Sequence, residues 1–201
     1  MKAKRSIILL ASLLLTVALV SYAGVLVVYN FEATITSTAA PLSFAGGTNA
    51  GGTDLGGNTI SVTITGNYTA SITLHPTYAP TYYFDVLNIV DNIAGDGNYY
   101  AQICVTNTLP ATNYTVANLY LYNKTGGTYV DLDTADPAIS PLSLTTSGCS
   151  SPIVLVDQNT YDFVFEFQVA EGTALNTADT FSITLYYSTN SADLGNIGSL
   201  P

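Results

Sequence analysis

The sequence predicts an all-β protein, an antiparallel β-sandwich of the jelly-roll or Ig-like type with a separate strand at its N-terminus. Hydrophobic and polar residues alternate with a period of two in one segment after another, which is typical of strands with one buried face. Turn residues such as glycine, asparagine and proline separate these segments, and there is almost no competing helical periodicity. About nine such strands with turns between them indicate a sandwich.

The first 23 residues have the layout of a secretory signal peptide. Lys2, Lys4 and Arg5 precede an uncharged, Leu-rich run that ends in small residues, which predicts cleavage after residue 23. No charge occurs from residue 6 to residue 31, however, and a run of that length also fits a membrane span or the N-terminal helix of a type IV pilin. The residues before the run do not match a pilin processing site, so we favour the cleaved signal.

Residues 24–38 are predicted to form a strand. Odd positions from 25 to 35 are all apolar, whereas the even positions change from Leu26 and Val28 to Asn30, Glu32 and Thr34. This alternation, with β-branched and aromatic residues, indicates a strand and not a continued helix. The residues expected on its inward face are Val25, Val27, Tyr29, Phe31, Ala33 and Ile35.

The charge of the chain changes more than its length when the signal is removed. Cleavage of 23 of the 201 residues leaves 178, enough for one domain with a core. One lysine, Lys124, then stands against 14 acidic residues, a formal charge of −13. Such a charge excludes nucleic acid as a partner. Only 9% of the whole chain is charged, and a surface of Thr, Ser, Asn and Tyr suits a secreted, extracellular or cell-surface location.

Residues 39–57 include "AGGTNAGGTDLGG" and are predicted to be a flexible, Gly-rich segment. No lysine follows the glycines and no helix starts there, so this is not a phosphate-binding loop. It can serve as a tether that lets the N-terminal strand reach away from its own domain, or it can be an ordinary surface loop.

Residues 58–201 are assigned to the sandwich. Its expected strands are 59–65, 71–75, 82–90, 99–107, 115–123, 128–132, 152–157, 161–170 and 180–188. In each of them one face is expected to pack inward, while the other carries Thr, Asp and Tyr to water.

Two cysteines, Cys104 and Cys149, are predicted to form a disulfide, because secretion implies an oxidising environment. The alternative is a pair of free thiols. Three Asn-X-Thr sequons, at Asn67, Asn113 and Asn123, are candidate glycosylation sites. They can also be chance matches in a chain rich in Asn and Thr.

Catalysis has little support in the sequence. The only histidine, His75, precedes a proline at a strand end, where a structural role is more common than general-base catalysis. Without a second histidine or a cysteine outside the predicted disulfide, the usual pairs of nucleophile and base have few candidates. We therefore expect the protein not to be an enzyme.

Two acid-rich stretches could hold a hard cation such as Ca²⁺, although neither fits the EF-hand spacing. The stretch "DLDTADP" offers the candidate ligands Asp131, Asp133 and Asp136, and "DNIAGDGN" offers Asp91, Asp96 and Asn98. The alternative is that these residues only stabilise turns.

The chain resembles the TasA-like biofilm-fibre proteins and the related archaeal bundling-pilus subunits. The resemblance rests on the order of its parts: a signal peptide, an alternating apolar strand directly after it, and a Thr/Asn-rich sandwich that contains "YYAQICVTNTLPATNYTVANLYLYN". It implies donor-strand exchange, in which the N-terminal strand of one subunit completes the sheet of the next. The donor residues would be the six inward-facing residues at positions 25–35. The disulfide departs from the bacterial members of the family.

The resemblance implies a structural subunit of an extracellular filament, a head-to-tail homopolymer that meets the membrane only during export and can bundle laterally. Two other functions stay open. One is a type IV pilin-like subunit with a helical core formed by residues from 6 to about 30. The other is a monomeric secreted adhesin or cell-surface binding module.

Overall fold

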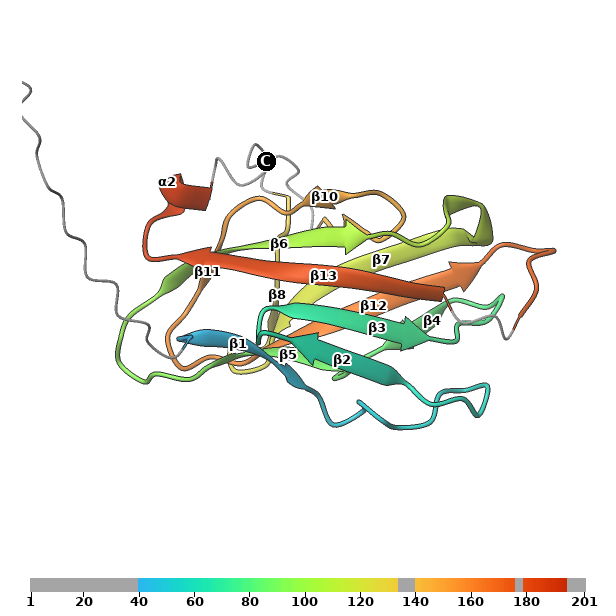
Figure 1. Ribbon diagram of the computed structural model, residues 1–201, viewed down its shortest axis with the longest axis horizontal. Helices are drawn as coiled ribbons and strands as arrows, with labels where there is room; N and C mark the ends of the chain where they lie inside the picture. Colours follow the sequence, from blue (N-terminus) through green and yellow to red (C-terminus); the bar gives the residue numbers. More distant parts are fainter. Residues whose placement is uncertain (1–39, 134–139, 176–178, 195–201) are drawn as a thin grey trace, which may run out of the picture. The chain divides into compact units, whose positions relative to one another are not determined.

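The structure, a computed structural model, describes residues 40–133, 140–175 and 179–194. In these residues thirteen strands form two antiparallel sheets that face each other, which confirms the predicted sandwich (Figure 1). The seven-stranded sheet has the order β1-β5-β12-β7-β8, with β4 also paired to β12 and β9 to β7. Its strands are β1 (Leu42–Gly46), β4 (Thr81–Tyr83), β5 (Leu87–Asp91), β7 (Tyr114–Asn123), β8 (Thr128–Val130), β9 (Leu142–Ser143) and β12 (Tyr161–Val169).

The six-stranded sheet has the order β10-β6-β13-β3-β2, with β11 also paired to β6. Its strands are β2 (Ser61–Thr65), β3 (Thr69–Leu74), β6 (Tyr99–Asn107), β10 (Gly148–Cys149), β11 (Ile153–Leu155) and β13 (Asp179–Ser188). A 3-10 turn, η1 (Ala111–Asn113), precedes β7, and a short helix, α2 (Ser191–Leu194), follows β13. No helix in the described part of the chain is long and apolar enough to cross a membrane.

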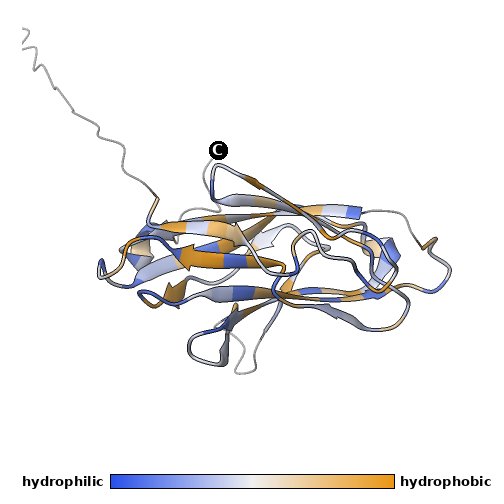
Figure 2. Ribbon diagram, turned by 90° about the horizontal axis from the view of Figure 1, so that it is seen from below, coloured by the Kyte–Doolittle hydropathy of each residue, from blue (hydrophilic) through white to orange (hydrophobic). Residues whose placement is uncertain are grey.

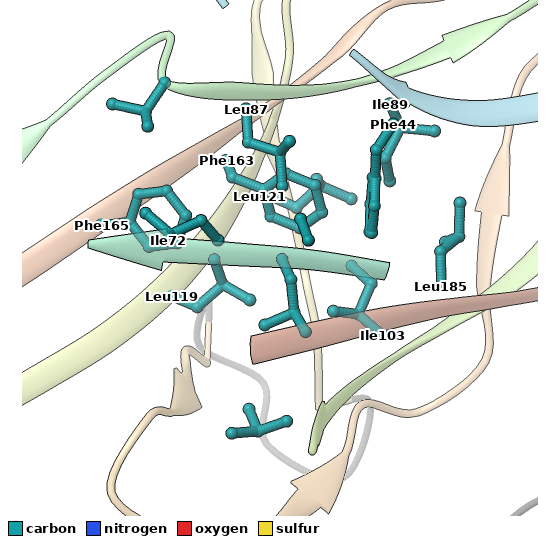
Figure 3. Close-up of a cluster of buried hydrophobic side chains, with 14 of the residues drawn as sticks. Phe44, Ile72, Leu87, Ile89, Ile103, Leu119, Leu121, Phe163, Phe165 and Leu185 are labelled. Carbon is teal, nitrogen blue, oxygen red and sulfur yellow. The ribbon is translucent and has the colours of Figure 1, made fainter. Parts of the chain in front are cut away.

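The core lies between the two sheets, and hydrophobic residues recur along the strands of both layers (Figure 2). Phe163, Phe165 and Phe167 point inward from β12 as every second residue, and all three are fully buried. The Phe165 ring meets Phe181 of β13 edge to face, with 5.4 Å between ring centroids. Aliphatic side chains from both sheets fill the space around these rings (Figure 3). Burial of these aromatic and aliphatic residues is the main force that holds the sheets together.

One predicted strand, 82–90, is divided in two. It breaks into β4 and β5 at Asp85, whose backbone has a φ of 51°. The Asp85 amide there donates to both side-chain carboxylate oxygens of Asp162 in β12, at 2.9 and 3.0 Å, and not to a backbone carbonyl of that strand. Both pieces lie on the same side of β12, because β7 occupies its whole opposite side.

The structure describes residues 40–57 of the segment that was predicted to be flexible and Gly-rich, and part of this segment has regular structure. Residues 42–46 form β1, which pairs with β5. Residues 47–60, which we call the Gly-rich hairpin, are folded by backbone hydrogen bonds of 2.9 Å from Gly51 to Ile60 and from Ile60 back to Gly52. The glycines make this fold possible, since Gly51 has a φ of 78° and a Cβ on Gly47 would lie 2.1 Å from the Asp85 carbonyl.

The predicted disulfide is confirmed. Cys104 of β6 and Cys149 of β10 are directly opposite each other in the antiparallel ladder and are bonded. β10 has only two residues, so the covalent bond fixes a strand that backbone pairing alone would hold weakly.

Candidate strand-binding groove

The seven-stranded sheet has an open edge at β4. β12 pairs with β5 near Tyr161 and with β4 near Phe167, and β1 then covers only the outer edge of β5. Among the described residues no strand pairs with the outer edge of β4. Unpaired strand edges expose backbone donors and acceptors that another chain can pair with.

The Gly-rich hairpin stands beside this edge. The Asn49 amide donates to the Asp85 carbonyl at 2.9 Å, and the Asn49 side chain donates to the Phe84 carbonyl at 2.7 Å. At its tip Asp54 accepts hydrogen bonds from the amides of Gly56 and Asn58, at 3.0 and 2.9 Å. The Asn49 contacts hold the hairpin against the turn that follows β4, and the Asp54 contacts fix the shape of its tip.

The single histidine also anchors this hairpin. Nδ1 of His75, just after β3, lies 2.9 Å from Oδ2 of Asp54, and the Asp54 side chain is fully buried. This arrangement is a structural contact between β3 and the hairpin, as the position of His75 at a strand end predicts.

Between β4 and the hairpin lies a groove of about 310 Å³, which we call the edge groove. It is lined by Thr81, Tyr82, Tyr83, Phe84 and Val86 on one side and by Asn49, Gly52, Thr53, Asp54, Leu55 and Ile60 on the other. Three of the large apolar residues exposed on the described surface belong to it: Leu55 is 83% exposed, Tyr82 51% and Phe84 49%. Their gathering at one place makes the groove a candidate site for an apolar partner.

Polar contacts fix the turn that borders the groove after Phe84. The Asp85 carboxylate accepts hydrogen bonds from Lys124 at 2.9 Å, Thr48 at 2.6 Å and Asn88 at 3.0 Å. The hydrogen bond from Lys124 is the main reason that the pKa of Asp85 lies well below its usual value. Burial instead raises the pKa of Asp162 to about 6. The pKa values of these two neighbouring carboxyl groups are therefore shifted in opposite directions.

The six-stranded sheet also ends in an unpaired strand. β2 pairs only with β3 among the described residues, and its Val62 and Ile64 are partly buried against the core. Ile60, which directly precedes β2, forms part of the edge groove. The groove therefore lies where the exposed margins of both sheets come together.

The predicted donor residues Val25, Val27, Tyr29, Phe31, Ala33 and Ile35 lie outside the described residues, as do the signal peptide and the rest of 24–38. Their roles stay predictions. The edge groove itself was missed by the sequence reasoning. The signal that could have found it is the group Tyr82-Tyr83-Phe84, which is followed by the turn residue Asp85, together with a leucine among glycines at position 55.

The structure describes two of the three predicted metal ligands, Asp131 and Asp133, and Asp136 lies outside the described residues. Oδ1 of Asp131 accepts hydrogen bonds from the amides of Asp133 and Ser140, at 3.1 and 3.2 Å, which is the turn-stabilising alternative. Calcium binding by these residues stays a prediction.

Two aspartates of the second acid-rich stretch, Asp91 and Asp96, belong to a cluster of three carboxylates. One carboxylate oxygen from each of Asp91, Asp96 and Asp157 lies within 4.8 Å of the others, and Asp157 comes from a distant part of the sequence, just after β11. Several of these oxygens also accept backbone hydrogen bonds, as Asp157 does from Gly95 at 3.2 Å. Such oxygens could ligate a hard cation.

The three sequons lie at turns or strand ends. Asn67 is exposed in the turn between β2 and β3 with a φ of 70°, and Asn113 precedes β7 and donates to Asp179 at 3.2 Å. Asn123 ends β7, and its Oδ1 accepts the amide of Gly126 at 2.8 Å. Glycosylation at these positions stays a prediction, and Asn67 is the most accessible of the three.

Comparisons of the chain with protein-family models and with curated proteins found no match.

Proposed function

We propose that this chain is the structural subunit of an extracellular filament that polymerises by strand addition. Residues 24–36 of one subunit would lie along β4 in the edge groove of the next. The observation that carries the proposal is the open β4 edge beside an apolar groove of about 310 Å³. An added strand would pair with the free backbone groups of β4 and bury its alternate apolar side chains. Because the contact is head-to-tail, it does not close on itself and yields a polymer.

The dimensions limit how the strand can bind. β4 has three residues and spans about 10 Å, whereas 13 residues in a strand span about 43 Å. Only part of the added strand can therefore pair with β4, and the rest must contact the hairpin around Leu55 and the turn at Phe84. Six inward side chains contribute on the order of 10 kcal/mol before ordering costs, enough for a stable polymer.

The proposal is tested with two variants that each damage one partner of the contact. Val27→Asp places a carboxylate on the donor face, and Leu55→Asp places one on the exposed rim of the edge groove. Each variant alone should fail to form filaments in electron micrographs. An equimolar mixture should form heterodimers, because each dimer joins the intact strand of one variant to the intact groove of the other.

Val154→Asp is the matched control. Val154 is 47% exposed, but it belongs to β11, which pairs with β6 in the other sheet and does not line the edge groove. It should polymerise like the wild type. If a chain without residues 24–36 forms normal filaments, these residues are not the donor strand. If Leu55→Asp polymerises normally while Val27→Asp does not, the donor strand stands but the assigned groove is wrong.

N-terminal sequencing of native filaments separates this proposal from the pilin-like alternative. A mature chain that begins near Gly24 supports strand donation, whereas one that begins near Ser6 supports a helical core. A secreted protein that stays monomeric in a size measurement would favour the adhesin.

A further inference from the structure

The outer face of the seven-stranded sheet carries a hollow of about 210 Å³, lined by Tyr82, Tyr120, Tyr129 and Val164. These residues come from β4, β7, β8 and β12, so four strands contribute to it. Val164 forms the floor: it points away from the core, as the neighbour of inward Phe163 and Phe165, yet only 1% of it is exposed. The walls are aromatic, and the Tyr120 and Tyr129 rings stand at 70° to each other with 6.1 Å between centroids.

A carboxylate lies behind two of these rings. Oε1 of Glu166 accepts a hydrogen bond from the Tyr82 hydroxyl at 2.6 Å. Oε2 accepts one from the Tyr120 hydroxyl at 2.9 Å and one from the side-chain amide of Asn118 at 3.1 Å. These donors outweigh burial, so the pKa of Glu166 is lowered and the group stays ionised. Burial, with the bond to Glu166, raises the pKa of Tyr120 to about 12, so its ring stays neutral. A phenol that donates to an anion becomes richer in electrons, which makes its face more attractive to a cation.

From this geometry we propose that the hollow binds an alkylated ammonium group, such as a quaternary ammonium. Aromatic walls, an apolar floor and a nearby fixed negative charge are the features that such a cation needs, and it requires no hydrogen bond. A metal ion is less suited, because the hollow offers only neutral phenol oxygens, and the Glu166 carboxylate behind them already accepts three hydrogen bonds. A sugar is less suited, because the Glu166 oxygens are already engaged by three protein donors.

No unmodified side chain of this sequence carries an alkylated ammonium group. Besides Lys2, Lys4 and Arg5 in the predicted signal peptide, the chain has one lysine, Lys124, which is paired with Asp85, and one histidine, His75, which contacts Asp54. A second copy of the mature chain therefore has no free cationic side chain to offer. The inference does not rest on strand addition, and its test is independent of filament formation.

Calorimetric titration of the mature chain with choline, and with its neutral isostere 3,3-dimethylbutan-1-ol, tests the proposal. The two probes have the same shape, so only the charge differs. We expect choline to bind at least about ten-fold more tightly than the isostere. Equal binding of the two probes would contradict the proposal, because the hollow would then recognise only apolar shape and not charge. A choline Kd above about 10 mM would also contradict it.

Variants locate the binding. Tyr129→Leu removes one aromatic face and should weaken choline binding about ten-fold, while Tyr129→Phe keeps the face and should bind normally. Glu166→Gln should weaken binding, whereas Glu171→Gln, which makes the same charge change on an exposed turn, should not. Normal binding by Tyr129→Leu would contradict the proposal even if Glu166→Gln failed to fold.

A peptide with a trimethylated lysine and the same peptide with unmodified lysine identify the source of the cation. Tighter binding of the trimethylated peptide than of choline indicates a protein partner, and the reverse indicates a small molecule. Binding of neither choline nor the trimethylated peptide overturns the proposal.

Discussion

The outer faces of the two sheets follow the same alternating pattern but carry different chemistry. On the six-stranded sheet, hydroxyls of β3 and β13 pair across the strands. The pairs are Thr69 with Thr184 at 3.3 Å, Ser71 with Ser182 at 2.8 Å and Thr73 with Thr180 at 2.9 Å. This face has neutral groups that satisfy one another.

The seven-stranded sheet instead places carboxylates and tyrosines outward. Glu166 accepts from two tyrosines and one asparagine, and Asp162 is only 4% exposed although it points away from the core. The difference teaches that outward-facing carboxylates gather on the seven-stranded sheet, which also has the open β4 edge, and both proposed binding sites are therefore on this sheet. The six-stranded face is expected to respond little to pH.

The largest effect should come from the one covalent link on the six-stranded face. Cys104 points outward, between inward Ile103 and Val105, and its disulfide to Cys149 closes a loop with a sequence separation of 45. Replacing both cysteines by serine should lower the free energy of unfolding by about 4 kcal/mol. Urea unfolding measures this, with reduced wild type as the matched control. A loss below about 1 kcal/mol would show that the strands hold without the disulfide.

The second effect concerns pH and the seven-stranded face. Burial raises the pKa of Asp162 from 3.8 to about 6, so the folded state keeps a proton that the unfolded state has lost. Stability should therefore fall as pH rises from about 4 to 6, by on the order of 2 kcal/mol. Asp162→Asn should remove this fall in urea titrations at each pH.

The ionisation of Asp85 should change stability in the opposite direction to that of Asp162, and over a lower range of pH. Because its pKa is lowered, its contribution is present above pH 3.8 and is lost as pH falls below that value. Ser182→Ala, on the six-stranded face, should keep the wild-type pH profile. A flat wild-type profile between pH 4 and 6 would contradict the assigned burial of the Asp162 charge.

The smallest effects compare single hydroxyls on the two faces. Tyr120→Phe removes a hydrogen bond to the ionised Glu166 and should cost about 1 kcal/mol, since bonds to charged groups are stronger than neutral ones. Thr180→Val removes a neutral, exposed pair with Thr73 and should cost less than about 0.5 kcal/mol. Thermal unfolding of both variants gives the comparison, and equal costs would mean that the two faces do not differ in strength.

Much of the fold could be predicted from the sequence because alternation is a local property. All nine predicted strand segments contain a strand, and the phenylalanines of β12 point inward as their spacing predicts. β1 was missed because "LSFAG" stands between a proline and a run of glycines, and its burial depends on pairing with β5. The break at Asp85 was missed because it depends on a carboxylate 77 positions away.

The surface sites were less predictable for the same physical reason. The tyrosine hollow needs Tyr82, Tyr120 and Tyr129 to meet, and only the register of β4, β12, β7 and β8 brings them together. The acid cluster needs Asp157, which no spacing rule connects to Asp91 and Asp96. The cysteine pair could be predicted because only one pairing exists within the chain.

The paired lysine has a consequence for proteolysis. After removal of residues 1–23, Lys124 is the only site at which a trypsin-like protease could cut. Its amide donates to the Thr160 carbonyl at 2.9 Å, and its ammonium is paired with Asp85. A protease must draw an extended segment into its cleft, and here both the main chain and the side chain of that segment are already engaged. The mature protein should therefore resist cleavage by trypsin for as long as it stays folded.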